Sequence, residues 1–191
     1  MYHAFAAGGG DLTSATVFLL DEFGLPRGAP ARCDTRLSRD LLDRLAAPPL
    51  RVVTWDTDAD DLGAMCETFD ADVADGGLDL VVLGIGGNGH LGINEPGTTR
   101  DAPTRIVELH PTTAAATDRY GADDRPAWGA TLGMARILEG REVWLLATGA
   151  HKAAIVRAAC RGPVGPHVPA SFLQTHPNVK VWLDEPAASA L

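Results

Sequence analysis

The residues with the clearest potential for chemistry lie in one short loop, at Asn88, His90, Asn94 and Glu95. This loop places a titratable imidazole and a carboxylate close together in the chain, on a segment walled by glycines. A histidine and a glutamate in such a setting are suited to acid/base chemistry on a small molecule. The loop is therefore the first candidate for a catalytic segment.

The element that must position this loop is an apolar, β-branched run from Leu78 to Leu83. The run breaks into glycines at Gly84, which is typical of a buried strand that opens into a tight loop. Open α/β sheets bind ligands at the carboxyl ends of their strands. We therefore expect the polar side chains of the loop to face a ligand site.

Two other interpretations of the loop stay open at this stage. Gly84 to Gly89 satisfies the G-x-G-x-x-G pattern of dinucleotide sites, with Glu108 roughly 20 residues further on. That pattern also needs a helix to begin at once, and Gly92 and Pro96 argue against a long helix here. The third interpretation is a plain connection between a strand and the next element.

The segment Gly84 to Gly97, GIGGNGHLGINEPG, closely resembles the active-site segment of glucosamine-6-phosphate deaminases. These sugar-phosphate isomerase-deaminases convert an amino sugar phosphate to a ketose phosphate and ammonia. The related 6-phosphogluconolactonases share a glycine-rich loop that ends in Gly-His but usually lack the Asn-Glu-Pro that follows. Asn94-Glu95-Pro96 therefore favours the deaminase branch, and the resemblance extends from about Thr16 to Pro186.

The expected fold is a single α/β domain over residues 1–191. Strand patterns at 16–20, 51–55, 79–85, 142–148 and 179–183 are mostly separated by helical patterns, including one at 30–47 and one at 60–75. This alternation predicts a three-layer sandwich with a largely parallel sheet. The resemblance implies the Rossmann-like, sugar-phosphate isomerase type of that fold.

Composition excludes several function classes. Apolar residues make up 46% and charged residues 21%, which is typical of a soluble globular protein, and the formal net charge of −9 disfavours nucleic acid and anionic membranes as partners. No run of about 18 apolar residues or signal peptide is visible, so a cytoplasmic location is the default expectation. We expect a small-molecule substrate and leave a homo-oligomer possible.

The three cysteines, Cys33, Cys66 and Cys160, are scattered and lack C-x-x-C spacing, which argues against a disulfide framework or a zinc site. The acidic run from Asp56 to Asp61 lacks the pattern of a calcium loop and is better interpreted as a cap on the following helix. We expect neither a metal nor another cofactor.

Two adjacent acids, Asp21 and Glu22, follow the first predicted strand. Exposed carboxylates before Gly24 and Pro26 commonly do no more than solvate a turn. The resemblance gives them a role instead. In the deaminases an Asp-Glu-aromatic segment stands here, and its first acid moves the proton of the sugar. That function maps onto Asp21, with Glu22 beside it as a substrate contact.

Arg119 and Lys152 are the candidate phosphate ligands. From the residues alone, Arg119 is more readily interpreted as an exposed cation paired with Asp118 or Asp123. For Lys152, an exposed lysine without function and a phosphate ligand are equally good interpretations. A phosphate at the helix that begins near Gly149 would offset the unfavourable position of Lys152 near the positive end of the helix dipole. The resemblance implies phosphate contacts for both, with Arg119 in a lid.

The resemblance also assigns substrate contacts to three loop glycines, Gly86, Gly87 and Gly89. It implies that His90 exchanges a proton with the sugar ring oxygen, while Asn88 and Glu95 orient the imidazole. Asp21 then moves a proton between C2 and C1, and the enolamine loses ammonia. The alternative enzyme class is lactone hydrolysis, in which the same histidine activates water.

Two departures from the family pattern are visible. Members begin with a further βαβ portion whose Gly-Ser/Gly-Thr-Pro loop cradles the phosphate, and Tyr2 to Ala7 corresponds to the helix that follows that loop. We therefore expect the sequence to start downstream of that phosphate loop. A truncated, inactive module that only binds its ligand stays an alternative to an enzyme. The lysine that binds an allosteric activator in some members is replaced by Val107, so we do not expect such control.

Overall fold

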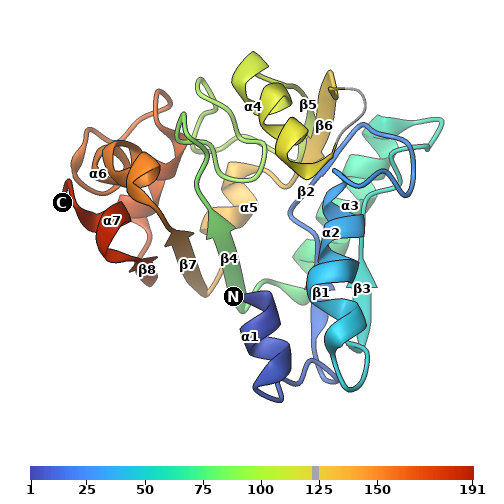
Figure 1. The fold of residues 1–191 in the computed structure, drawn as a ribbon. Helices are drawn as coiled ribbons and strands as arrows, with labels where there is room; N and C mark the ends of the chain where they lie inside the picture. Colours follow the sequence, from blue (N-terminus) through green and yellow to red (C-terminus); the bar gives the residue numbers. More distant parts are fainter. Residues whose placement is uncertain (122–124) are drawn as a thin grey trace.

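The parallel strands of the protein lie in two separate groups (Figure 1). The computed structural model describes residues 1–121 and 125–191. In one group β1 (Thr16–Phe18) pairs with β3 (Arg51–Val53), and in the other β7 (Glu142–Ala147) lies between β4 (Leu80–Gly84) and β8 (Val179–Leu183). All of these pairs are parallel, and the expected α/β class is confirmed.

The remaining sheet is antiparallel, with β6 (Trp128–Thr131) between β2 (Asp21–Phe23) and β5 (Arg105–Glu108). The predicted strand at 16–20 therefore ends at Phe18, and the two acids after it belong to a strand of their own. The interpretation of Asp21 and Glu22 as a solvated turn is wrong, since the Glu22 side chain is fully buried. Pairing with β6 overrides the low strand propensity of acidic residues.

Alternation along the central strands explains how the β4–β7–β8 sheet contributes to the core. Val81 and Leu83 face inward together with Val143 and Leu145, and all four are buried. Helices α5 (Met134–Leu138) and α6 (Ala153–Arg161) supply apolar side chains to the same cluster. The opposite face is more open, and Trp182 on β8 is 52% exposed.

The predicted helix at 60–75 is observed as α3 (Leu62–Gly76). Asp61 is its N-cap, and its side chain accepts a hydrogen bond of 2.9 Å from the Ala64 backbone N–H. Asp56 and Asp58 pair with Arg27. The interpretation of the acidic run as a helix cap is thus confirmed for its last residue, and two of the others are held by an arginine.

The other predicted helices are shorter than expected. The helical pattern at 30–47 gives α2 (Cys33–Asp40) and a 3₁₀ turn at Leu42–Arg44, and α1 (Tyr2–Ala7) lies at the N-terminus. The chain ends in α7 (Glu185–Ala188), far from β1 in Figure 1. No helix in the described ranges is long and apolar enough to span a membrane.

An open channel separates the two parallel groups. A cavity of about 1540 Å³ is lined by successive residues of β1 and of β4, so it runs along the edges of both strands. Because side chains of a strand alternate between its two faces, successive residues line one cavity only where the edge of the strand is unpaired. Among the described residues, no strand joins β1 to β4, and the predicted sheet is divided at this point.

Candidate active site

The cavity between the two parallel groups collects most of the predicted site residues. Its lining includes the predicted site residues Asp21, Gly86, Gly87, Asn88, His90, Arg119 and Lys152. The short helix α4 (Pro111–Ala116) borders the same space through Thr112 and Thr113. Segments far apart in the chain thus meet around one cavity.

The loop after β4 turns back on itself through backbone hydrogen bonds. The Gly86 N–H donates to the His90 carbonyl at 3.0 Å, and the Gly89 N–H donates to the Gly86 carbonyl at 3.0 Å. Gly89 has φ of +90°, which favours glycine. A Cβ at Gly89 would meet Val168 and Ile155, so its absence serves packing, and Gly89 does not line the cavity as the predicted substrate contact would.

No helix follows the glycines at once. Residues 85–104, all of them described, form turns and bends, and the next helix is α4. The dinucleotide interpretation requires a helix N-terminus at this place, so it is wrong for this loop.

His90 is held by a carboxylate and an amide from its own loop. Its Nδ1 lies 3.3 Å from Glu95 Oε2, and the Asn88 side-chain amide donates to the same oxygen at 2.8 Å. The His90 backbone N–H also donates to Asn88 Oδ1 at 3.2 Å. Assigning the Nδ1 proton to the bond with Glu95 leaves Nε2 free to exchange a proton with a ligand.

Thr113 is a contact of the site that the sequence did not reveal. Its hydroxyl lies 3.3 Å from His90 Nδ1 and comes from α4, which is distant in the chain. No local pattern marks a threonine in a short alanine-rich helix as functional. The contact arises only because α4 packs over the loop.

Asn94 has a structural role in the loop. It is fully buried, and its amide donates to the carbonyls of Leu91 and Leu132 at 3.0 and 2.9 Å. Its oxygen accepts a hydrogen bond of 2.9 Å from Arg105. Asn94 therefore connects the loop after β4 to the residue that follows β6 and to β5.

Glu95 is ionised in this setting. Burial alone would raise the pKa of Glu95, but hydrogen bonds to His90 and Asn88 and the charge of His90 outweigh it and lower the pKa to about 2. The side chain is 10% exposed, so solvent screens these interactions little. An ionised Glu95 is suited to fix the orientation of the His90 ring through the contact with Nδ1.

This lowered pKa predicts how acid destabilises the fold. Because the pKa is depressed from 4.5 to about 2, ionised Glu95 stabilises the folded state above pH 4.5, and that contribution is lost as the pH falls toward 2. The difference in unfolding free energy between wild type and Glu95→Gln, measured by urea titration, should shrink by about half between pH 7 and pH 3. A difference that is independent of pH would contradict the assignment.

Asp21 is the first residue of β2, and it lies beside the loop, since a Cβ at Gly92 would lie 3.9 Å from the Asp21 Cβ. Burial raises the pKa of Asp21, and the positive charges of His90 and Arg36 offset part of that rise. A carboxylate that accepts a proton more readily than usual is a better proton carrier. The structure thus places Asp21 and His90 on the same cavity, as the sequence predicted.

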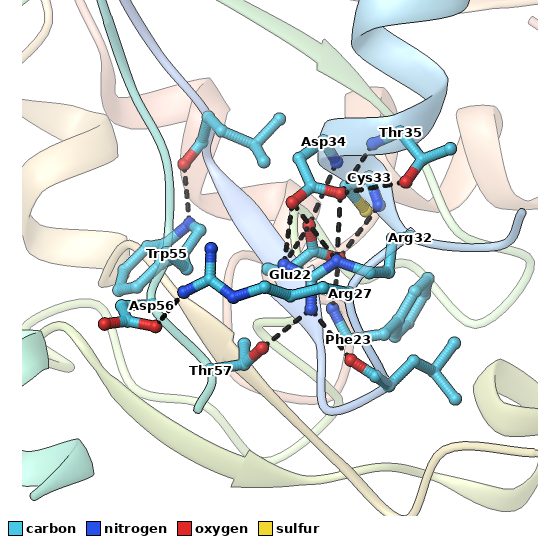
Figure 2. Close-up of polar contacts among 12 residues, drawn as sticks. Glu22, Phe23, Arg27, Arg32, Cys33, Asp34, Thr35, Trp55, Asp56 and Thr57 are labelled. Atoms are coloured by element: carbon cyan, nitrogen blue, oxygen red, sulfur yellow. Dashed lines mark hydrogen bonds and ion pairs between the residues drawn. The ribbon is translucent and has the colours of Figure 1, made fainter. Parts of the chain in front are cut away.

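Glu22 points the other way, because successive side chains of a strand alternate. Its carboxylate accepts hydrogen bonds from the backbone N–H groups of Phe23, Cys33 and Asp34 at 2.8 to 2.9 Å (Figure 2). It therefore caps the N-terminus of α2, and it does not line the cavity. In place of the predicted substrate contact, we assign Glu22 a structural role.

Arg32 completes this buried cluster behind Asp21. Its Nη2 lies 3.4 Å from Glu22 Oε2 and 2.7 Å from Asp34 Oδ2, and its Nη1 donates to Thr57 at 2.7 Å (Figure 2). Burial raises the pKa of Glu22 to about 7, although the backbone N–H groups and Arg32 act in the opposite direction. The cluster joins β2, α2 and the segment after β3.

Two cations define another part of the cavity. Lys152 lies in the 3₁₀ turn Ala150–Lys152 before α6, and its Nζ donates to the Ile85 carbonyl at 2.6 Å. Burial and the nearby charge of Arg119 lower the pKa of Lys152. Two like charges held close together in a cavity favour an anionic ligand between them.

The alternative interpretation placed Arg119 in a surface ion pair with Asp118 or Asp123, and Asp118 has a different partner. Asp118 is paired with Arg125 at 2.6 Å, whereas Arg119 donates from Nε to the Ala116 carbonyl at 3.0 Å. Asp123, the other expected partner, lies outside the described residues. Within residues 1–121 and 125–191, no three His, Cys, Asp or Glu side chains gather closely enough to hold a metal.

Comparison with known proteins agrees with this geometry. The family model for glucosamine-6-phosphate isomerases and 6-phosphogluconolactonases matches residues 1–182. The chain belongs to this family. A glucosamine-6-phosphate deaminase of Rhodopirellula baltica is 43% identical over 189 residues, which is 97% of this chain and 75% of the relative. One from Pseudarthrobacter chlorophenolicus is 42% identical, over 97% of this chain and 73% of the relative.

Solved structures place the chain within the same family. A monomeric glucosamine-6-phosphate deaminase matches with a TM-score of 0.91 at 33% identity, over 98% of this chain and 80% of that one. A 6-phosphogluconolactonase from Thermotoga maritima matches with a TM-score of 0.76 at 19% identity, over 95% of this chain and 78% of that one. The second likeness is one of fold alone. The chain spans about three quarters of the length of the relatives it matches.

Proposed function

We propose that this protein converts glucosamine 6-phosphate and water to fructose 6-phosphate and ammonia. The observation that carries the proposal is the convergence of the Asp21 carboxylate and the Glu95-held imidazole of His90 on one cavity. Two proton-transfer groups on one ligand site are what an aldose-to-ketose isomerisation requires. The names of the family relatives support the same reaction.

In the proposed mechanism, His90 gives a proton to the sugar ring oxygen through Nε2, the bond between C1 and the ring oxygen breaks, and the C1 hydroxyl returns a proton to His90 as the aldehyde forms. Asp21 then takes the proton from C2 while the aldehyde oxygen gains a proton, which gives an enolamine. Asp21 returns its proton to C1 as the nitrogen loses one, which leaves an imine at C2. Water adds to that imine, and ammonia leaves. Burial suits Asp21 to hold the proton between these two steps, since it raises the pKa of the carboxyl.

A direct test follows the carbon skeleton and the nitrogen in one sample. Purified protein is incubated with glucosamine 6-phosphate, the phosphorylated sugars are followed by NMR, and ammonia is assayed in parallel. Fructose 6-phosphate and ammonia should appear in equal amounts. Binding of the sugar without turnover would instead support the inactive binding module. Oligomeric state and cytoplasmic location stay predictions from the sequence.

Lys152 is expected to bind the substrate phosphate together with Arg119. Replacing Lys152 with methionine should raise the KM for glucosamine 6-phosphate about tenfold, because a charge-assisted hydrogen bond to phosphate is lost, with a smaller effect on kcat. Arg157→Met on α6 is a matched control, since Arg157 bonds only to the Ala190 carbonyl among the described residues. An unchanged KM in Lys152→Met would contradict the phosphate role.

Gly86 is expected to be required for the position of His90. A Cβ at Gly86 would lie 2.4 Å from the His90 ring, so Gly86→Ala must displace the imidazole. A displacement of about 1 Å typically costs about a hundredfold in rate, and we expect kcat to fall by that order. Gly165→Ala is the control, because a Cβ there meets nothing within 4 Å. Equal kcat values for both variants would refute this positioning role.

A further inference from the structure

Arg36 is a cation of the cavity to which the sequence assigned no role. It lies on α2, one turn beyond the residues that Glu22 caps, and it lines the same cavity as Asp21 and Lys152. The helix that carries it shows an ordinary half-buried pattern, which predicted only packing. In the structure, Arg36 and the last residue of the helix, Asp40, are the charged residues of α2 that line the cavity.

An aromatic ring holds Arg36 in place. The guanidinium carbon lies 3.6 Å from the centroid of the Tyr120 ring, which is the geometry of a close cation–π contact. Tyr120 ends the 3₁₀ turn Thr117–Tyr120, and the Arg119 guanidinium lies 5.7 Å from the same centroid. The ring of Tyr120 therefore lies close to both arginines, and all three residues line the cavity.

Arg36 lacks the polar partners that arginines usually find. Among the described residues its side chain makes no hydrogen bond or ion pair, and its Nε is buried without an acceptor. Arg32, on the other side of Glu22, is by contrast satisfied by Asp34, Thr57 and a carbonyl. A buried donor without a partner is costly, and a ligand acceptor would remove that cost.

We propose that Arg36 is a third anion-binding residue of the site and contacts the phosphate group of the substrate together with Arg119 and Lys152. This inference rests on the proposed function. A phosphate dianion has three acceptor oxygens, and a guanidinium presents a planar set of donors that fits two of them. The contact with the Tyr120 ring restricts the Arg36 side chain before the ligand arrives, which reduces the entropy lost on binding.

Calorimetric titration with inorganic phosphate at low salt tests the inference. Arg36→Gln should weaken phosphate binding about tenfold, the loss of one charge-assisted contact, and Arg36→Lys should weaken it less because the charge remains. Arg39→Gln is the matched control, since Arg39 is on the same helix but paired with Asp40 at the surface. Circular dichroism and thermal unfolding verify that each variant is folded.

The possible outcomes separate this inference from the proposed function. Phosphate binding to wild type with equal affinity in folded Arg36→Gln would overturn the role of Arg36 and leave the proposed function standing. A wild type that neither binds phosphate nor releases ammonia would overturn both. An altered pH profile of kcat in Arg36→Gln, with unchanged phosphate affinity, would show that Arg36 acts on the ionisation of Asp21. That result would likewise overturn the phosphate contact.

Discussion

Ammonia release from glucosamine 6-phosphate is expected to fall at least about a hundredfold in Asp21→Asn and in His90→Ala, as measured by kcat at saturating substrate. Asparagine keeps the shape of the Asp21 side chain but cannot accept the C2 proton. Alanine at position 90 removes the group that opens the ring. Both side chains line the one cavity, so each loss blocks a separate step of the same reaction.

Asp58→Asn is the matched control for these two variants, because it removes one carboxylate charge from a residue that pairs with Arg27 at the surface. Its kcat should equal that of wild type. Turnover within a factor of about three of wild type in Asp21→Asn would contradict the assignment of Asp21 as the proton carrier, whatever the result for His90.

The largest effect on stability is expected for Glu22→Ala, at about 3–5 kcal/mol of unfolding free energy. The substitution removes the cap of α2 and leaves the fully buried Arg32 with Asp34 as its remaining charged partner. It also frees the backbone of β2, which carries Asp21. Urea unfolding of wild type and variant measures the change.

Arg39→Ala is the control for this prediction, because its pair with Asp40 is exposed and should contribute less than about 1 kcal/mol. A loss below about 1 kcal/mol in Glu22→Ala would show that the cluster in Figure 2 contributes little to the fold. A variant too unstable to purify would agree with the prediction, and Glu22→Gln then provides a milder substitution for the measurement.

The sequence predicted the local arrangement of the loop after β4 well because the information for it is local. Glycines, a strand end and the His90–Glu95 spacing all lie within one segment, and the structure keeps them together. The direction of Glu22 was not predictable in the same way. It depends on β2 pairing with β6, which begins over a hundred residues later and sets which side chain of the strand faces the cavity.

Contacts between distant elements account for the other differences. Thr113 reaches His90 because α4 packs over the loop, and Arg36 lines the cavity in contact with Tyr120, which is distant in the chain. Neither residue carries a local signal. The division of the parallel strands into two groups could not be predicted either. A strand pattern indicates that a segment is extended, but it does not identify the neighbouring strand.

The most direct measurement compares two reactions of the same purified protein at one enzyme concentration. One sample receives glucosamine 6-phosphate and is assayed for ammonia, and the other receives 6-phosphogluconolactone and is assayed for acid release above the spontaneous rate. We predict ammonia release that is lost in Asp21→Asn, with no enzymatic acid release. Acid release without ammonia would contradict the proposed function and assign the cavity to lactone hydrolysis.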